Sequence, residues 1–197
     1  MATLELRVHP LTQQGFAEFG EVIETDGRDS FLINDGRCRR FHDLADVDVS
    51  RQNGRPLINI FRTAPVAPPV AIHLLERHPL GSQAFVSLSS RPFLVVVASG
   101  GETVTPEAVR AFVTNGRQGV NYRGGIWHHP LLALGGTSDF LVVDRGGNGD
   151  NYEEFRFDSE APEIVISSLP AAVAEPADSS AGAPSNASRG IPTRNAT

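Results

Sequence analysis

Short apolar runs separated by turn-forming residues make up most of this chain. Apolar and polar positions alternate from Pro56 to Arg62 and in parts of Gln83 to Leu88, which predicts strands with one buried face. Phe93 to Ala98 and Phe140 to Val143 are continuous apolar runs, as expected for strands buried on both faces. Many short strands with Gly and Pro between them favour a small barrel or jelly roll over a parallel α/β sheet.

Two short helices are also predicted. The first, from Thr12 to Phe19, has two phenylalanines at helical spacing, a Thr that can cap its start and Gly20 at its end. The second, from Thr105 to Asn115, begins with a capping Thr followed by Pro106, which suits the first helical position, and Gly116 follows its end. Its apolar stripe would consist of Val109, Phe112 and Val113.

The composition changes near residue 170. From Pro170 to Thr197 the chain is mostly Ala, Ser, Pro and Gly, with almost no large apolar residues. Such a segment buries too little surface to offset its ordering entropy. We therefore expect one folded domain over residues 1–166 and a flexible tail over residues 167–197.

Charge and composition exclude several classes of function. The formal net charge is −6, which argues against non-specific nucleic-acid binding. All 17 basic residues are Arg, so a lysine Schiff base is excluded. No apolar run approaches the ~18 residues of a membrane span, and no secretory signature is present at the N-terminus. With Cys38 as the single cysteine, the sequence predicts a soluble cytoplasmic protein without an internal disulfide.

Two polar clusters within the predicted strands can carry chemistry, Glu76 to Phe85 and Gly119 to Leu131. Glu76 and His78 are two residues apart, so they point to the same face of a strand. Of the adjacent His128 and His129, only one can face a barrel interior. The predicted site therefore combines Glu76, His78, Gln83 and His128.

This set fits two kinds of chemistry. Imidazole, carboxylate and amide ligands suit a divalent metal such as nickel, zinc or manganese. The same groups suit general acid–base catalysis without a metal. The spacing also resembles the two cupin motifs, because Glu76-x-His78-x4-Gln83 is followed by Arg123-x-Gly125-x2-His128. Two of the usual cupin ligand types are changed.

A closer resemblance is to the bacterial ureidoglycolate lyase family. It rests on stretches spread over most of the predicted domain: Ile33-Asn34-Asp35-Gly36, Arg40-Phe41-His42-Asp43-Leu44, Glu76 to Phe85, Arg110-Ala111-Phe112, Gly119-Val120-Asn121-Tyr122, Trp127-His128-His129-Pro130-Leu131, and Asp139 to Gly146. The strings Glu-Arg-His-Pro-Leu-Gly-x-Gln-Ala-Phe and Trp-His-His-Pro-Leu are specific. One departure is that Arg123 lies four residues before Trp127, where the family commonly has an Arg three before.

The resemblance implies a cupin-like jelly-roll enzyme that cleaves (S)-ureidoglycolate to glyoxylate and urea in allantoin catabolism. It implies Glu76, His78 and His128 as catalytic residues, and a homodimer with a divalent metal, nickel by resemblance. The implied metal ligands are Glu76, His78, Gln83 and His128. The implied substrate-binding residues are Asn34, Arg40, His42, Arg62, Gln83, Asn121 and Tyr122.

Two other functions remain open at this point. One is a cupin-type metal-dependent enzyme that acts on another small hydroxy acid. The other is a non-catalytic module that senses a small carboxylate, although a sensor does not need an acid–base pair. The small-molecule ligand is common to all three hypotheses, and none involves a nucleic acid or a membrane.

Overall fold

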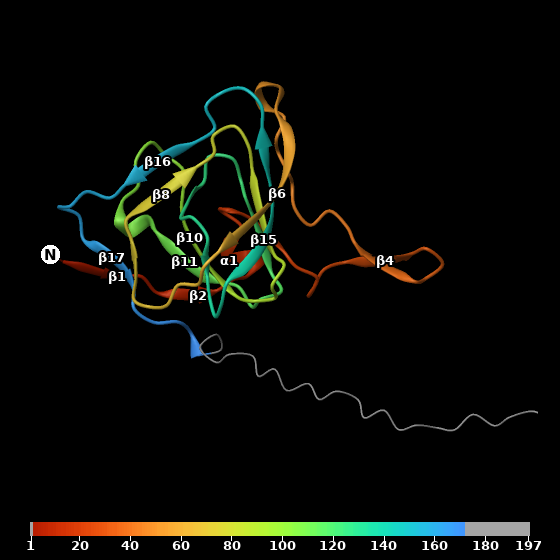
Figure 1. Ribbon diagram of the computed structural model, residues 1–197, viewed down its shortest axis with the longest axis horizontal. Helices are drawn as coiled ribbons and strands as arrows, with labels where there is room; N and C mark the ends of the chain where they lie inside the picture. The colour runs from red at the N-terminus through yellow and green to blue at the C-terminus, as the bar shows by residue number, and fades with distance from the viewer. Residues whose placement is uncertain (1, 172–197) are drawn as a thin grey trace, which may run out of the picture.

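The continuous apolar run of Phe93–Ala98 forms strand β10, which is buried on both faces. The computed structural model describes residues 2–171 (Figure 1). In β10, Phe93, Val95 and Val97 pack into one core cluster, and the residues between them pack into a second. Side chains of a strand alternate between faces, so a strand with a core on each side is apolar at every position. This prediction is confirmed.

Residues 2–171 form four sheets, and their fold is mainly β with a few short helices. The order in the largest sheet is β16-β8-β13-β10-β11-β2, with β14 also paired to β10, and a five-stranded sheet has the order β3-β12-β9-β15-β6. A three-stranded sheet (β1-β17-β7) and the hairpin β4-β5 complete it. The predicted mainly β, jelly-roll class is confirmed.

The strands are short, and most have three to six residues. Those of the largest sheet are β2 (Val8–Pro10), β8 (Leu74–Arg77), β10 (Phe93–Ala98), β11 (Arg110–Val113), β13 (Trp127–His128), β14 (Leu132–Ala133) and β16 (Glu153–Arg156). Those of the five-stranded sheet are β3 (Gly20–Ile23), β6 (Arg55–Thr63), β9 (Gln83–Ser87), β12 (Gly119–Tyr122) and β15 (Ser138–Gly146). The others are β1 (Thr3–Glu5), β4 (Ser30–Ile33), β5 (Cys38–Phe41), β7 (Val70–Ile72) and β17 (Glu163–Ile166).

Two apolar layers hold the sheets together. One layer lies between the seven-stranded and five-stranded sheets and is rich in phenylalanine, with Phe93 and Phe140 in edge contact at 5.1 Å between ring centroids. The other lies between the seven-stranded and three-stranded sheets and is mostly aliphatic. Burial of these side chains is the main force that stabilises the sandwich.

The predicted helix from Thr105 to Asn115 is wrong. Only Pro106–Ala108 forms a turn of 3₁₀ helix, and Arg110–Val113 is strand β11, paired with β10 and β2. Val109, Ala111 and Val113 face one core and Phe112 faces the other, so the true period is two. The spacing of the apolar residues is compatible both with the period of a helix and with the period of a strand. Pairing with the central strand β10 makes the segment a strand.

The first predicted helix is present but shorter. Helix α1 (Gln13–Phe16) is capped by Thr12, whose Oγ1 accepts a hydrogen bond from the Gly15 amide at 3.1 Å. After Phe16 the chain turns, which buries Phe19 and leads into β3 at Gly20. A Cβ at Gly20 would lie 1.8 Å from the carbonyl oxygen of Asn121, so the close pairing of β3 with β12 requires glycine there.

Strand β15 departs from the expectation for the run Phe140 to Val143. Phe140 and Val142 are fully buried, whereas Leu141 and Val143 on the other face are only half-buried. Their cross-strand partners on β6, Ile60 and Ile58, are exposed. The outer face of the five-stranded sheet is therefore apolar and is not covered by the residues that the structure describes.

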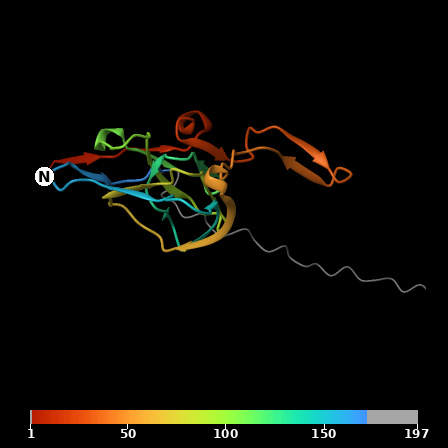
Figure 2. The same ribbon diagram turned by 90° about the horizontal axis from the view of Figure 1, so that it is seen from above.

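The hairpin β4-β5 projects away from the body of the domain, as both views show (Figures 1 and 2). Its two strands pair with each other and with no other strand of the described chain. A 3₁₀ turn at Arg51–Asn53 then leads into β6.

The predicted boundary at residue 166 stays a prediction, and the predicted tail lies outside the described residues from position 172 onward. Among residues 2–171, no helix has the length and apolarity needed to cross a membrane.

Truncation of Phe93 should test the phenylalanine-rich layer. The side chain is fully buried, so Phe93→Ala is expected to lower the free energy of unfolding by roughly 3–5 kcal/mol, measured by urea titration. The matched control is Val47→Ala, at an exposed position, which should change it by less than about 0.5 kcal/mol. Equal losses for the two variants would contradict this account of the core.

Candidate active site

Glu76, His78 and His128 converge where strands β8 and β13 pair. Glu76 and His128 are direct cross-strand partners, and Glu76 Oε1 lies 3.6 Å from His128 Nε2. His78 follows two residues after Glu76, and its ring centroid lies 5.3 Å from that of His128. One ligand atom from each residue lies within 4.8 Å of the others. The same-face spacing inferred from the sequence thus corresponds to a real cluster.

Backbone carbonyls fix the tautomers of both histidines. His78 Nδ1 donates to the carbonyl of Asn151 at 2.7 Å, and His128 Nδ1 donates to the carbonyl of Ile126 at 3.0 Å. Each Nε2 of the neutral rings therefore carries a lone pair. His78 Nε2 is buried and has no hydrogen-bond partner within the described chain. Such an arrangement is ready to accept a proton or bind a cation.

Gln83 and Tyr122 form the opposite wall, on the five-stranded sheet. They are cross-strand partners on β9 and β12, and Tyr122 stacks on the His128 ring at 4.3 Å with an interplanar angle of 13°. Gln83 Oε1 lies 3.1 Å from His128 Nε2. Two acceptors at this distance repel, unless the amide turns its NH₂ group inward or a cation lies between them. The stacking locks the His128 ring in place.

Burial controls the ionisation of the cluster. It raises the pKa of Glu76, an effect that His78 opposes and Glu154 reinforces. Burial, followed by the nearby His78, lowers the pKa of His128 to about 3, against an opposing hydrogen bond to Ile126. His128 is therefore neutral at physiological pH, with its Nε2 free to act as a base or ligand. Burial also raises the pKa of Tyr122, so its hydroxyl remains protonated.

Several of the predicted substrate-binding residues lie elsewhere in the chain. Asn34, Arg40 and His42 belong to the projecting hairpin or its base, and Arg62 forms a bidentate ion pair with Asp139 on the surface. Asn121 is buried and donates to Glu21 and to the Asp46 carbonyl, which ties β12 to neighbouring segments. Gln83 and Tyr122 alone among the seven contact the histidine cluster.

The unusually placed Arg123 has a structural environment. It donates to the Ala17 carbonyl at 2.8 Å and pairs with Glu21 at 3.1 Å, which links the segment before β13 to the turn after α1. Its side chain is half exposed. These contacts direct its charge toward the α1 turn.

Sequence reasoning missed Asn151. Its carbonyl orients His78, and its side-chain oxygen accepts from the Leu80 amide at 2.8 Å. Nearby, Tyr152 stands 6.2 Å from His78 between ring centroids and donates to Glu154. Asn151 lies more than 70 residues from His78 in a Gly- and Asn-rich loop, and such a loop gives no signal that it closes over a site.

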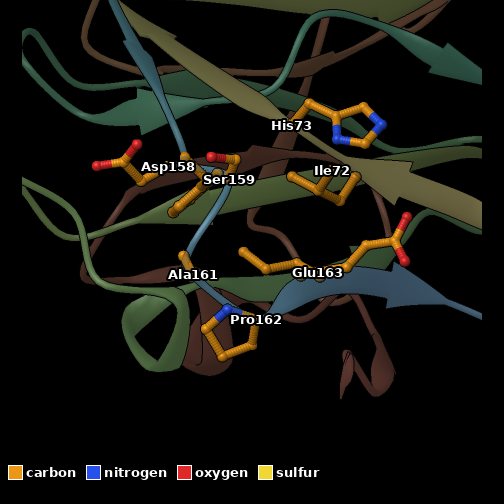
Figure 3. Close-up of a pocket in the computed structure, with 9 residues that line it drawn as sticks. Ile72, His73, Asp158, Ser159, Ala161, Pro162 and Glu163 are labelled. Atoms are coloured by element: carbon orange, nitrogen blue, oxygen red, sulfur yellow. The ribbon is translucent and has the colours of Figure 1, made fainter. Parts of the chain in front are cut away.

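A separate surface pocket of about 360 Å³ is lined by Ile72, His73, residues 157–159 and residues 161–164 (Figure 3). Its lining is mostly apolar. Asp158 and Glu163 lie at opposite ends, so their carboxylates do not converge with the His73 ring. The pocket thus lacks the converging donors and acceptors that distinguish the Glu76–His78–His128 cluster.

Comparison with known proteins gives a consistent result. The family model for ureidoglycolate lyase matches residues 3–164. The chain is 52% identical to a ureidoglycolate lyase from Pseudomonas syringae over 166 residues, which is 84% of this chain and 97% of the relative. It is 57% identical to a ureidoglycolate lyase from Burkholderia mallei over 149 residues, which is 76% of this chain and 87% of the relative.

Solved structures add only a distant likeness. A 3,4-ketoisomerase from Helicobacter canadensis aligns with a TM-score of 0.40 and 12% identity, over 68% of this chain and 88% of that one. This similarity is too low to bear on function. The family model and the close relatives both cover the strands that carry Glu76, His78 and His128. The chain therefore belongs to the ureidoglycolate lyase family.

Proposed function

We infer that this protein is a ureidoglycolate lyase, which cleaves (S)-ureidoglycolate to glyoxylate and urea in allantoin catabolism. The observation that carries the inference is the convergence of Glu76 with the Nε2 atoms of two histidines whose Nδ1 atoms bond backbone carbonyls, in a chain more than half identical to proteins named for this reaction. A cytoplasmic homodimer is part of the same proposal.

The reaction needs only one net proton transfer. The substrate carbon carries a hydroxyl, a carboxylate and a ureido nitrogen. Loss of the hydroxyl proton lets the oxygen form the C=O bond of glyoxylate while the C–N bond breaks. The departing nitrogen takes up one proton to give urea. One group that first accepts a proton and then donates it can therefore serve both steps.

Glu76 is the residue best suited to this transfer. Its pKa is raised by burial, so the carboxylate is a stronger base than an exposed one and the resulting acid is still able to donate. Tyr122 holds the neighbouring His128 ring by stacking, and Gln83 offers an amide to the ureido group. The Glu76 side chain is 19% exposed, so its contact with water is limited.

The same residues fit a divalent metal ion. His78 Nε2 is buried without a partner, and His128 Nε2 faces it with a lone pair, which is the donor chemistry of a borderline cation such as nickel. His78 and His128 would hold the ion, with Glu76 and Gln83 beside them. A bound ion would act as a Lewis acid toward the substrate oxygens.

The direct test is to incubate the purified protein with each enantiomer of ureidoglycolate and follow glyoxylate and urea. Equimolar release of both products from the (S) form supports the lyase. Release of ammonia in place of urea would indicate hydrolysis, and binding without turnover would indicate a carboxylate sensor. Turnover of other hydroxy acids alone would favour a different cupin-type activity.

Metal removal should abolish turnover. Prolonged chelation is expected to reduce the rate to background, and nickel or manganese should restore it, because His78 Nε2 otherwise has no partner. Metal content measured by mass spectrometry before and after dialysis checks that the ion is gone. Full activity in a metal-free sample would exclude the metal version and leave catalysis to the side chains.

A further inference from the structure

Residues 30–42, which comprise the β4-β5 hairpin and His42, form an arm that has no strand partner in the described part of the chain. It extends from the domain in both views, and no other strand pairs with it among the described residues (Figures 1 and 2). Its turn is tightly specified, because Asn34, Asp35 and Gly36 all have positive φ. A two-stranded hairpin is marginal by itself in water. Contact with another molecule would stabilise it.

One face of the arm presents an arranged group of donors. Arg40 is the cross-strand partner of Phe31, lies 5.9 Å above its ring and donates to His42 Nδ1 at 3.0 Å. His42 Nε2 therefore carries the proton of the neutral ring, so both side chains point donors outward. Arg39 differs, because it faces the other side and donates to Ser30.

The site needs such donors. Its substrate is a carboxylate, yet the groups around it are acidic, with Glu76 and Glu154 close together. The arginines that flank it have other partners within the described chain. Arg77 pairs with Glu153 and stacks on Trp127, Arg145 donates to backbone carbonyls, and Arg51 bonds Asp48 and the Pro79 carbonyl.

A second copy of this chain is the molecule that fits the arm. No described residue covers the apolar outer face of the five-stranded sheet, where Ile58 is 77% exposed and Ile60 and Leu88 are each 56% exposed. Such a face usually marks a contact surface. The arm carries three arginines against one aspartate, in a chain of net charge −6, so it complements the acidic surroundings of the site.

We propose that the arm of each protomer docks on a second copy of the chain and delivers Arg40 and His42 to the other copy's Glu76–His78–His128 site. There the guanidinium and the imidazole N–H bind the substrate carboxylate. The identity of that carboxylate rests on the proposed function. In this arrangement, residues of two chains form each active site. It also explains why the arm holds the donors of Arg40 and His42 in a fixed arrangement.

Substitution of Arg40 tests the binding role. Arg40→Gln is expected to raise KM for ureidoglycolate by roughly 10- to 100-fold with a smaller change in kcat, because a charge-assisted hydrogen bond is lost. Arg39→Gln, on the opposite face of the same strand, should leave KM within about twofold. If Arg51→Gln raises KM and Arg40→Gln does not, the arginine that binds the substrate carboxylate comes from the same chain as the site, and the proposal is wrong.

Mixed dimers test the shared site. At substrate concentrations well below the wild-type KM, Arg40→Gln chains and His78→Asn chains are each expected to be nearly inactive. They are co-expressed with different affinity tags so that mixed dimers can be isolated and assayed at those concentrations. If Arg40 acts across the interface, one of the two sites contains both native residues, and about half of the wild-type rate returns. If Arg40 acts within its own chain, both sites are defective. A mixed dimer no more active than its parents overturns the proposal.

Cross-linking from Cys38 provides a readout that does not depend on activity. Cys38 is exposed on β5 and is the single cysteine of the chain, so a photoreactive maleimide labels the arm alone. We expect cross-links between chains that map to the loop around Asn151, together with a dimeric mass in sedimentation. The control Cys38→Ser/Ser159→Cys moves the label to the separate pocket and should lose those cross-links.

Cross-linking and the activity assay together distinguish failure of the arm proposal from failure of the proposed function. Cross-links to the site in a protein that does not cleave ureidoglycolate would refute the proposed function and keep the arm. A monomeric mass, or cross-links confined to one chain, in a protein that does cleave it would refute the arm and keep the lyase.

Discussion

Replacement of His78 by Asn is expected to lower kcat for ureidoglycolate cleavage by roughly 10²- to 10⁴-fold. The Asn amide can still donate to the Asn151 carbonyl, as His78 Nδ1 does at 2.7 Å, but it has nothing at the position of Nε2. Loss of Nε2 removes a ligand if a metal is bound, and it removes the imidazole that assists Glu76 in the proton transfer if none is. Steady-state kinetics, with metal analysis of the same samples, measures both.

The matched control is His73→Asn, five residues earlier. The His73 side chain is exposed and lines the separate pocket, and its backbone bond to Phe157 does not depend on the side chain. Its kcat should stay within about twofold of the wild type. Near-normal turnover in His78→Asn, with a thermal midpoint close to that of the wild type in both variants, would show that the active site lies elsewhere.

Local patterns predicted the fold where the burial of a strand determines its sequence. Strand β10 reads as apolar at every position because it has a core on each side. The region from Thr105 to Asn115 was misread because its end signals are local, whereas pairing of β11 with β10 is a contact between distant segments. The apolar stripe of the predicted helix also left out Ala111, whose side chain is small but fully buried. With Ala111 included, the buried positions have the period of two that is typical of a strand.

The candidate site was accessible from the sequence only where its residues share a strand or a motif. Glu76 and His78 are two residues apart, and this spacing alone puts them on one face. Asn151 could not be found, because a loop far along the chain supplies a backbone carbonyl, which any residue type has. Asn121 was read as a ligand-binding amide, yet its donors bond Glu21 and the Asp46 carbonyl.

The hairpin residues show a different limit. The family resemblance connects Arg40 and His42 with the substrate, but in a single chain they lie on the projecting arm. A pattern along one sequence cannot tell whether two motifs meet within a chain or between chains. The half-buried Leu141 and Val143 show the same limit. The run Phe140 to Val143 is apolar enough for burial on both faces, but the sequence does not show whether the second face is covered by the same chain or by another.

Replacement of Glu76 by Gln is expected to reduce kcat/KM by roughly 10²- to 10⁴-fold and to remove the acidic limb of its pH profile. Glu76 must be ionised to accept the hydroxyl proton, so activity falls as the pH drops through its pKa. Burial raises that pKa, which sets the limb of the wild type above the ordinary value of about 4.3 for glutamate. His128, with a pKa of about 3, stays neutral through this range and does not produce the limb.

Glu154→Gln is the matched variant for this prediction. Glu154 raises the pKa of Glu76 by charge repulsion, so its neutralisation favours the ionised form of Glu76. The acidic limb should then move to lower pH, while kcat at neutral pH changes little. Metal analysis of the Glu76→Gln protein separates loss of a base from loss of a ligand. A Glu76→Gln enzyme that keeps both its rate and its acidic limb would show that another group moves the proton.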